Sequence, residues 1–172
     1  LREILDAVEC AAARCGVTIV TGDTKVVPRG QCDGIYVNTA GVGEGIAGLS
    51  LGVERIRCGD VVLVSGTLAE HGFAILAARE SMPAVRGATS DSGPVHRLVA
   101  AAAAYGDAVR FMRDPTRGGL ATVLTEVAEG AEQGIELEED ALPLSSAGKA
   151  LSELLGLDPL HVASEGRVVA VC

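Results

Sequence analysis

The chain has 172 residues and a net charge of −9, with 48% apolar and 22% charged residues, two Phe, two Tyr and no Trp. This composition excludes a disordered protein, and the length suits one domain or one domain plus part of another. A general nucleic-acid surface is excluded because it needs a basic face and stacking aromatics. The acidic first residues, LREILDAVEC, are no signal peptide, and no stretch has membrane-spanning length without a charge or a Gly/Pro break. We expect a soluble, cytoplasmic protein.

The first elements are a helix and short strands. Apolar residues recur at helical spacing over 1–15, and Gly16 follows as a terminator. The β-branched run 17–21 predicts a strand, 26–28 a further extended piece, and 35–40 another strand. These segments together predict a helix followed by extended chain.

A glycine-rich stretch then separates two parts of the chain. Residues 43–48 match GxGxxG, but too few residues remain before the turn at Arg57 for the crossover helix of a dinucleotide site. We interpret this stretch as a connection, with a domain boundary between residues 46 and 58. Beyond it we expect a strand at 61–65, a helix at 69–79 and a polar loop through Ser90. A helix to Tyr105 then starts at Asp91 or Ser92 as its cap, with Pro94 in its first turn. The remaining elements are a strand at 109–112, a helix to Gly130, a strand at 135–138, a helix at 146–155 and a strand at 167–172. Helices mixed with strands predict an α+β or α/β fold.

Cysteine spacing and acidic clustering give no sign of a metal centre. The cysteines Cys10, Cys15, Cys32, Cys58 and Cys172 form no CxxC pair, so we expect free, buried thiols in a reducing compartment. Residues 126–140 are rich in carboxylates but lack the regular oxygen spacing of a cation loop. We interpret them as a solvated helix end and an exposed strand edge.

The strongest local signal is the loop RDPTRGG at 113–119, between a predicted strand and a predicted helix. Glycines, a helix N-terminus and Arg117 can hold a phosphate. A plain helix start with Asp114 as N-cap and Pro115 at N1 is the alternative. That alternative does not explain two consecutive glycines, which cost up to about 1 kcal/mol each in a helix. Both interpretations stay open on these residues alone.

Two further loops carry reactive side chains. Gly22-Asp23-Thr24-Lys25 could hold Mg²⁺ and a phosphate, although an isolated tetrapeptide of this kind is more often a turn. Ser164-Glu165-Gly166-Arg167 would place a carboxylate at the mouth of the last strand, and it too reads as a turn when taken alone. The three histidines, His71, His96 and His161, share no ligand spacing, so surface or packing roles are expected for them.

Taken in order, VTGDTKVVPRGQCDGIYVNTAGVG, RDPTRGGLATVLTEVA and ASEGR resemble the HypE family of hydrogenase maturation factors, and this resemblance covers essentially the whole chain. That family belongs to the superfamily of aminoimidazole ribonucleotide synthetase, selenophosphate synthetase and thiamine-monophosphate kinase. The resemblance implies that residues 1–45 close a ferredoxin-like, dimerising, ATP-binding domain. Residues 46–172 would form most of the α/β C-terminal domain.

The activity that the resemblance implies is ATP-dependent dehydration of a cysteine-linked thiocarbamate to a thiocyanate, the source of a cyanide ligand for [NiFe]-hydrogenase. The implied partners are the carbamoyltransferase HypF and the HypC–HypD complex, with no nucleic acid and no membrane. By the same resemblance, ATP phosphates and Mg²⁺ would be bound by Asp23 (also the metal ligand), Thr24, Lys25, Thr116, Arg117, Gly118 and Gly119, while Lys25, Asp114 and Glu165 would be catalytic.

The sequence departs from the family in three places. Ser164 stands where such proteins often have Asn, Cys172 ends a strand instead of a flexible Pro-Arg-x-Cys tail, and the early aspartate segment of the ATP site is missing. We therefore expect a piece of a longer protein that does not turn over ATP alone, with the carrier cysteine elsewhere than Cys172. Another ATP-dependent member of the superfamily and a non-catalytic docking module remain alternatives.

Overall fold

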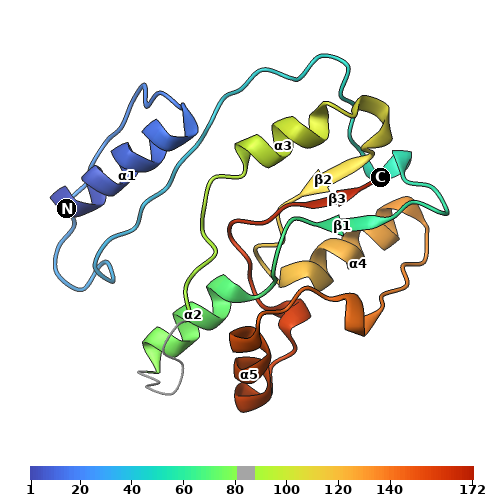
Figure 1. Cartoon of the computed structure of the whole chain (residues 1–172). Coiled ribbons are helices and arrows are strands. Elements are labelled where there is room, and N and C mark those ends of the chain that lie inside the picture. Colours follow the sequence, from blue (N-terminus) through green and yellow to red (C-terminus); the bar gives the residue numbers. More distant parts are fainter. Residues whose placement is uncertain (81–87) are drawn as a thin grey trace. The chain divides into compact units, whose positions relative to one another are not determined.

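The computed structural model describes residues 1–80 and 88–172, so the predicted polar loop through Ser90 lies largely outside the described residues. The chain divides into two compact units, Leu1–Ala47 (unit 1) and Gly48–Cys172 (unit 2). Figure 1 shows both units with their elements labelled.

Unit 1 contains one helix, α1, over Arg2–Cys15. Ile4, Val8, Ala12 and Cys15 form its half-buried face, at the helical spacing that the sequence predicts. Gly16 ends the helix in the left-handed conformation with φ 67, which a glycine adopts without a Cβ clash. The prediction for this segment is confirmed.

The strands predicted at 17–21 and 35–40, and the extended piece at 26–28, are not paired into any sheet among the described residues. Val20 is 88% exposed and Val26 is 89% exposed. A β-strand is stabilised by hydrogen bonds and side-chain contacts with a neighbouring strand. The β-branched pattern alone therefore yields extended backbone here, and the strand assignments are wrong for this structure.

Unit 2 is built on a three-stranded sheet in the order β1-β3-β2, formed by β1 (Val62–Val64), β2 (Phe111–Arg113) and β3 (Val169–Val171). Both pairings are antiparallel, and Val64 and Arg113 lie opposite Val169 in register. The last strand of the chain is thus the central one. Unit 2 is therefore a mixed α and β structure with a small antiparallel sheet, within the expected α+β or α/β class.

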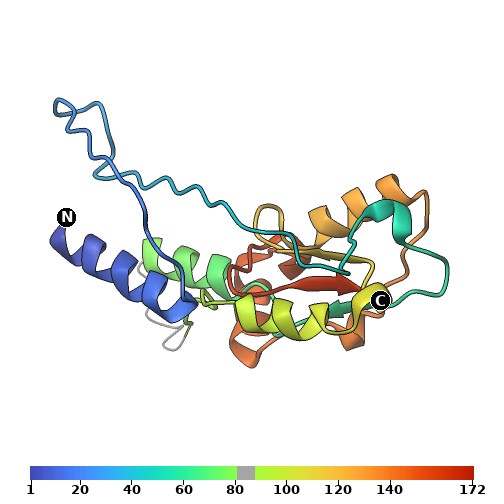
Figure 2. The ribbon, with the colours of Figure 1, turned by 90° about the horizontal axis from the view of Figure 1, so that it is seen from above.

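The helices of unit 2 are α2 (Glu70–Arg79), α3 (His96–Ala103), α4 (Gly119–Ala131) and α5 (Ser146–Leu155). In the two ribbon views α4 covers one side of the sheet, and α3 lies on the other side (Figures 1 and 2). The buried core joins α4 to α2, α5 and the central strand through Leu68, Ala69, Phe73, Leu120, Val123, Leu124, Val127, Leu151 and Val169. Aliphatic side chains and one phenylalanine supply this core, as the composition requires.

Two predictions for unit 2 are wrong, the start of one helix and the presence of one strand. Helix α3 begins at His96, after the N-cap Val95, and no side chain caps it. Asp91 does not cap the helix because its carboxylate accepts the backbone N–H of Glu165. Residues 135–138 form no strand, and the chain turns there into a short 3-10 helix at Glu139–Ala141. Ile135 is a single apolar residue that packs against the core, which does not require a strand.

The cysteines are free, as predicted, but none is buried. Cys10 and Cys58 are exposed, and Cys15, Cys32 and Cys172 are half-buried. In the described ranges, no helix combines the length and the apolar character needed to span a bilayer.

Candidate functional site

Strand β2 leads directly into the loop that the sequence singles out. Arg113, its last residue, forms an ion pair with Glu126 on α4. Pro115 is buried, and its carbonyl oxygen accepts the N–H of Ser164 at 3.0 Å. This hydrogen bond joins two segments that are far apart in the sequence and places the 113–117 loop beside the 163–166 turn.

A polar pocket of about 390 Å³ lies where these two segments meet, lined by Arg113, Asp114, Thr116, Arg117 and Glu165. Four of these residues are predicted site residues, and Arg113 is an addition. The structure therefore brings together the two motifs of unit 2 that the sequence proposes separately. Both carboxylates of the pocket belong to residues with an expected catalytic role, Asp114 and Glu165.

The double glycine has a structural explanation. The N-cap of α4 is Gly118, in the left-handed conformation with φ 72, and Gly119 follows with φ 64. A Cβ at Gly119 would overlap the carbonyl oxygen of Leu160 and lie 2.8 Å from that of Val162. Only glycine meets both demands. A helix start capped by Asp114 with Pro115 at N1 is wrong, because the helix begins at Gly119.

Among the described residues that line the pocket, one cation has no ion-pair partner. Thr116 donates its hydroxyl to Asp114 Oδ2 at 2.6 Å, and Arg113 is paired with Glu126. Arg117 is exposed and forms no ion pair with any described residue. A guanidinium can bind two phosphate oxygens at once. Arg117 beside the start of α4 thus fits a phosphate group.

The remaining predicted ligands, Asp23, Thr24 and Lys25, are exposed residues of unit 1. Asp23 Oδ1 accepts the N–H of Thr24 at 2.8 Å, so a local turn is present. Among the described residues no group of three or more His, Cys, Asp or Glu side chains gathers as a metal site. A lone carboxylate still fits Mg²⁺ that arrives with phosphates, because that ion is often held by one or two carboxylates plus substrate oxygens.

The turn that carries Glu165 is fastened to the start of α2. Ser164 is buried, and its Oγ accepts the N–H of Ala69 at 2.8 Å. The N–H of Gly72 in turn donates to the carbonyl oxygen of Ala163. A serine hydroxyl therefore has a definite anchoring role where the resembling proteins often have Asn. It holds the turn in place without reaching the pocket.

The same anchoring brings His71 close to Glu165, with Nε2 4.0 Å from Oε1. This contact was not expected, since a surface or packing role was predicted for His71. Its position in the first turn of the helix that follows β1 was the available signal. Asp91, read as a helix cap, is the second residue whose place near Glu165 the sequence did not reveal.

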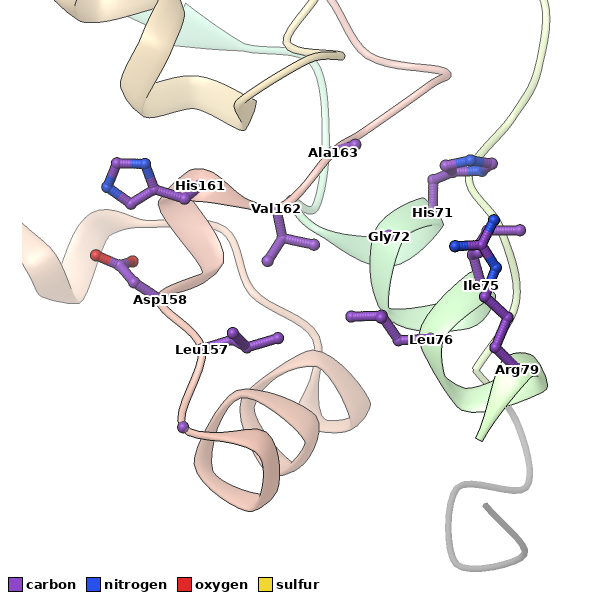
Figure 3. Close-up of a pocket in the computed structure, with 11 residues that line it drawn as sticks. His71, Gly72, Ile75, Leu76, Arg79, Leu157, Asp158, His161, Val162 and Ala163 are labelled. Atoms are coloured by element: carbon purple, nitrogen blue, oxygen red, sulfur yellow. The ribbon is translucent and has the colours of Figure 1, made fainter. Parts of the chain in front are cut away.

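A larger pocket of about 520 Å³ lies between α2 and residues 156–163. Figure 3 shows Leu76, Leu157 and Val162 directed toward one another across it. The predicted site residues are absent from its lining, so the candidate chemistry belongs to the smaller, charged pocket.

Comparison with known proteins agrees with the sequence motifs. The family described as AIR synthase related protein, C-terminal domain, matches residues 57–172. The carbamoyl dehydratase HypE of Bradyrhizobium diazoefficiens is 49% identical over 172 residues, which cover 99% of this chain and 50% of that protein. HypE of Escherichia coli K12 is 41% identical over 169 residues, covering 98% of this chain and 50% of that protein.

Solved structures give the same result. A crystal structure of the hydrogenase maturation protein HypE in complex with ATP is 39% identical, has a TM-score of 0.92, and aligns with 99% of this chain and 52% of that chain. A HypE–HypF complex is 36% identical with a TM-score of 0.88, covering 99% of this chain and 56% of that one. The chain thus spans about half the length of the relatives that it matches.

Proposed function

The chain belongs to the AIR synthase related protein family, and from this membership we propose that it supplies the phosphate-binding and proton-transferring part of an ATP-dependent carbamoyl dehydratase for [NiFe]-hydrogenase maturation. The observation that carries the proposal is the single pocket that joins Asp114, Thr116, Arg117 and Glu165. The relatives of the chain are named carbamoyl dehydratases, and one HypE structure contains ATP.

Dehydrating a thiocarbamate to a thiocyanate removes the carbamoyl oxygen and two protons from the nitrogen. ATP, when bound, supplies the phosphoryl group that makes this oxygen a leaving group. Arg117 and the backbone N–H of Gly118 would hold phosphate oxygens and stabilise the charge that develops on them, whereas the N–H of Gly119 already donates to the Thr116 carbonyl oxygen. Thr116 is oriented by Asp114. Glu165 accepts a proton from the substrate nitrogen, because its carboxylate lines the same pocket.

Unit 1 carries the other predicted ligands. Lys25 would bind phosphate oxygens as a point charge, Thr24 would add a hydroxyl, and Asp23 would hold a phosphate-bound Mg²⁺. We assign residues 1–45 to the closing part of a ferredoxin-like domain and 46–172 to the α/β domain.

The proposal extends to the cellular setting. We assign the protein to the cytoplasm, as a homodimer through the ferredoxin-like domain. Its partners would be the carbamoyltransferase HypF, which occurs in complex with one HypE relative, and the HypC–HypD complex. The thiocarbamate is carried by a cysteine other than Cys172, whose backbone pairs with Val61 beside the sheet.

The activity is tested in a chimera in which these 172 residues replace the homologous half of the Bradyrhizobium HypE. We expect the carbamoylated chimera to lose one water per cysteine in intact-mass measurements, only when MgATP is added. Arg117→Ala should slow this loss about 100-fold, a typical cost of removing one charge-stabilising donor.

Arg97→Ala removes the same charge from an exposed position on α3 and serves as the matched control, with an expected rate within about twofold of the unaltered chimera. No water loss in a folded chimera would contradict the proposed function. Equal rates for Arg117→Ala and Arg97→Ala would contradict the assignment of the pocket.

The 172-residue chain by itself should not hydrolyse ATP, because it spans about half the length of the carbamoyl dehydratases that it matches. Phosphate release from the purified chain that disappears in Asp114→Ala would overturn this expectation.

A further inference from the structure

His71 is the side chain of α2 that approaches Glu165. Its Nε2 lies 4.0 Å from Glu165 Oε1, and 27% of the His71 side chain and 40% of the Glu165 side chain are exposed. On the other side of the ring, Nδ1 lies 2.8 Å from Ser90 Oγ. The imidazole thus stands between a hydroxyl and the carboxylate of the polar pocket.

Ser90 favours one tautomer of the His71 ring when its hydroxyl donates to Nδ1. Its Oγ already accepts the N–H of Ser92 at 3.0 Å, and its own hydroxyl proton can be donated to Nδ1 of His71. The neutral ring then carries its proton on Nε2, the nitrogen that lies 4.0 Å from Glu165 Oε1. The opposite tautomer would direct a lone pair at a carboxylate, which is electrostatically unfavourable.

Asp91 holds the backbone of Glu165 from the same short segment. Its side chain is 1% exposed, its Oδ1 accepts the Glu165 N–H at 3.0 Å, and its Oδ2 lies 3.7 Å from Arg167 Nε. Arg167 is fixed in turn, because its Nε donates to the carbonyl oxygen of Thr67 at 2.8 Å. Gly166 allows this approach, since a Cβ there would overlap the carbonyl oxygen of Asp91.

We propose that His71, oriented by Ser90, is a positioning residue that holds the Glu165 carboxylate in the polar pocket, while Asp91 fixes the Glu165 backbone. The proposal rests on the proposed function for the role of Glu165 as the proton acceptor. A half-exposed carboxylate has several rotamers open to it, and an N–H directed at one oxygen favours the rotamer that faces the pocket. Adjacent residues, 90 and 91, thus control both ends of Glu165.

The consequence for the reaction is specific. His71 acts on the proton acceptor and not on the phosphates, so its loss should lower kcat and leave the KM for ATP unchanged. In the chimera we expect His71→Ala to reduce kcat about 10- to 100-fold, the usual cost of a misplaced reacting group. His71→Gln places an amide N–H near the former Nε2 and should recover most of the lost rate.

His96→Ala, an exposed histidine of α3, is the control and should retain the full rate. A kcat for His71→Ala within twofold of the His96→Ala value would overturn the proposal, as would an equal loss in His71→Gln. If the unaltered chimera shows no dehydration, the proposed function fails, and His71 is then judged by a measurement that needs no activity.

That measurement is long-range ¹H–¹⁵N correlation of the histidine rings in the 172-residue chain, at alkaline pH where an ordinary imidazole is neutral. The three ring systems are assigned with single His→Gln variants. We expect the Nε2–H tautomer for His71 and a loss of this preference in both Ser90→Ala and Glu165→Gln. An Nδ1–H tautomer, or a preference unchanged in the two variants, would overturn the proposal.

Discussion

The two units use similar β-branched sequences with opposite outcomes. The run VVLVS contributes β1, which pairs with β3 in register over Val62–Val64. The run VTIVT at 17–21 remains extended and unpaired among the described residues, and Ile19 is 56% exposed. Strand formation in this protein therefore depends on a neighbouring strand and a covering helix more than on the local residues.

The same contrast separates their contributions to stability. Unit 2 has a buried cluster that includes Phe73 and Leu120, and α1 of unit 1 has no buried residue. The free energy of unfolding should therefore reside in unit 2, and the substitutions below are arranged from the largest expected effect to the smallest.

Phe73→Ala should have the largest effect, because it removes the largest fully buried side chain of unit 2 and leaves a cavity in the core. We expect a loss of about 3 to 5 kcal/mol in the free energy of unfolding, followed through the amide signals of unit 2 in urea. Ile19→Ala in unit 1 is the matched control, and it should change the free energy of unfolding measured from those signals by less than about 0.5 kcal/mol. Comparable losses of unfolding free energy in the two variants would contradict the claim that stability resides in unit 2.

Gly119→Ala should rank next. The substitution forces a Cβ against the carbonyl oxygens of Leu160 and Val162 at a φ of 64, and we expect a loss of about 2 to 3 kcal/mol. Gly156→Ala, also in unit 2, has a φ of 65 but no atom of the described residues within 4 Å of the added Cβ. It should cost only the left-handed backbone strain, about 1 kcal/mol. Equal losses in urea unfolding would mean that the close packing at Gly119 contributes nothing.

Asp60 gives the smallest effect, on the acid side. The N–H of Arg57 and the guanidinium of Arg110, 2.7 Å away, hold the pKa of the Asp60 carboxyl below its usual range. A native pKa below the unfolded value of about 3.9 adds stability that is complete at neutral pH. This stability is lost as the pH falls through the lower native pKa. In urea titrations at stepped pH, Asp60→Asn should lack this part of the acid decline, and an unchanged decline would exclude the Asp60 carboxyl as its cause.

The accuracy of the sequence predictions follows the range of the interactions involved. The helices at 2–15, 119–131 and 146–155 were predicted within one or two residues because helical periodicity and the terminator Gly16 are local signals. The three strands of the sheet in unit 2 were predicted within a few residues, whereas the strand expected at 135–138 does not form. The prediction of Asp91 as a helix cap was wrong because its carboxylate accepts the N–H of Glu165, a residue distant in sequence.

The candidate site shows the same limit. The loop at 113–119 and the turn at 164–167 were each recognised as motifs, but their contact depends on the hydrogen bond from Ser164 to Pro115. No local pattern encodes such a contact. His71 was missed for the same reason, since its relation to Glu165 exists only once α2 has packed against the 163–166 turn.

The central claim is that unit 2 carries a phosphate site at Arg117 and the start of α4. Titration of the ¹⁵N-labelled 172-residue chain with MgATP tests it most directly. The predicted result is a saturable shift of the Thr116, Gly118 and Gly119 amides that is lost in Arg117→Ala and retained in Arg97→Ala. Amides at 116–119 that do not move with MgATP, or that move equally in Arg117→Ala, would contradict it.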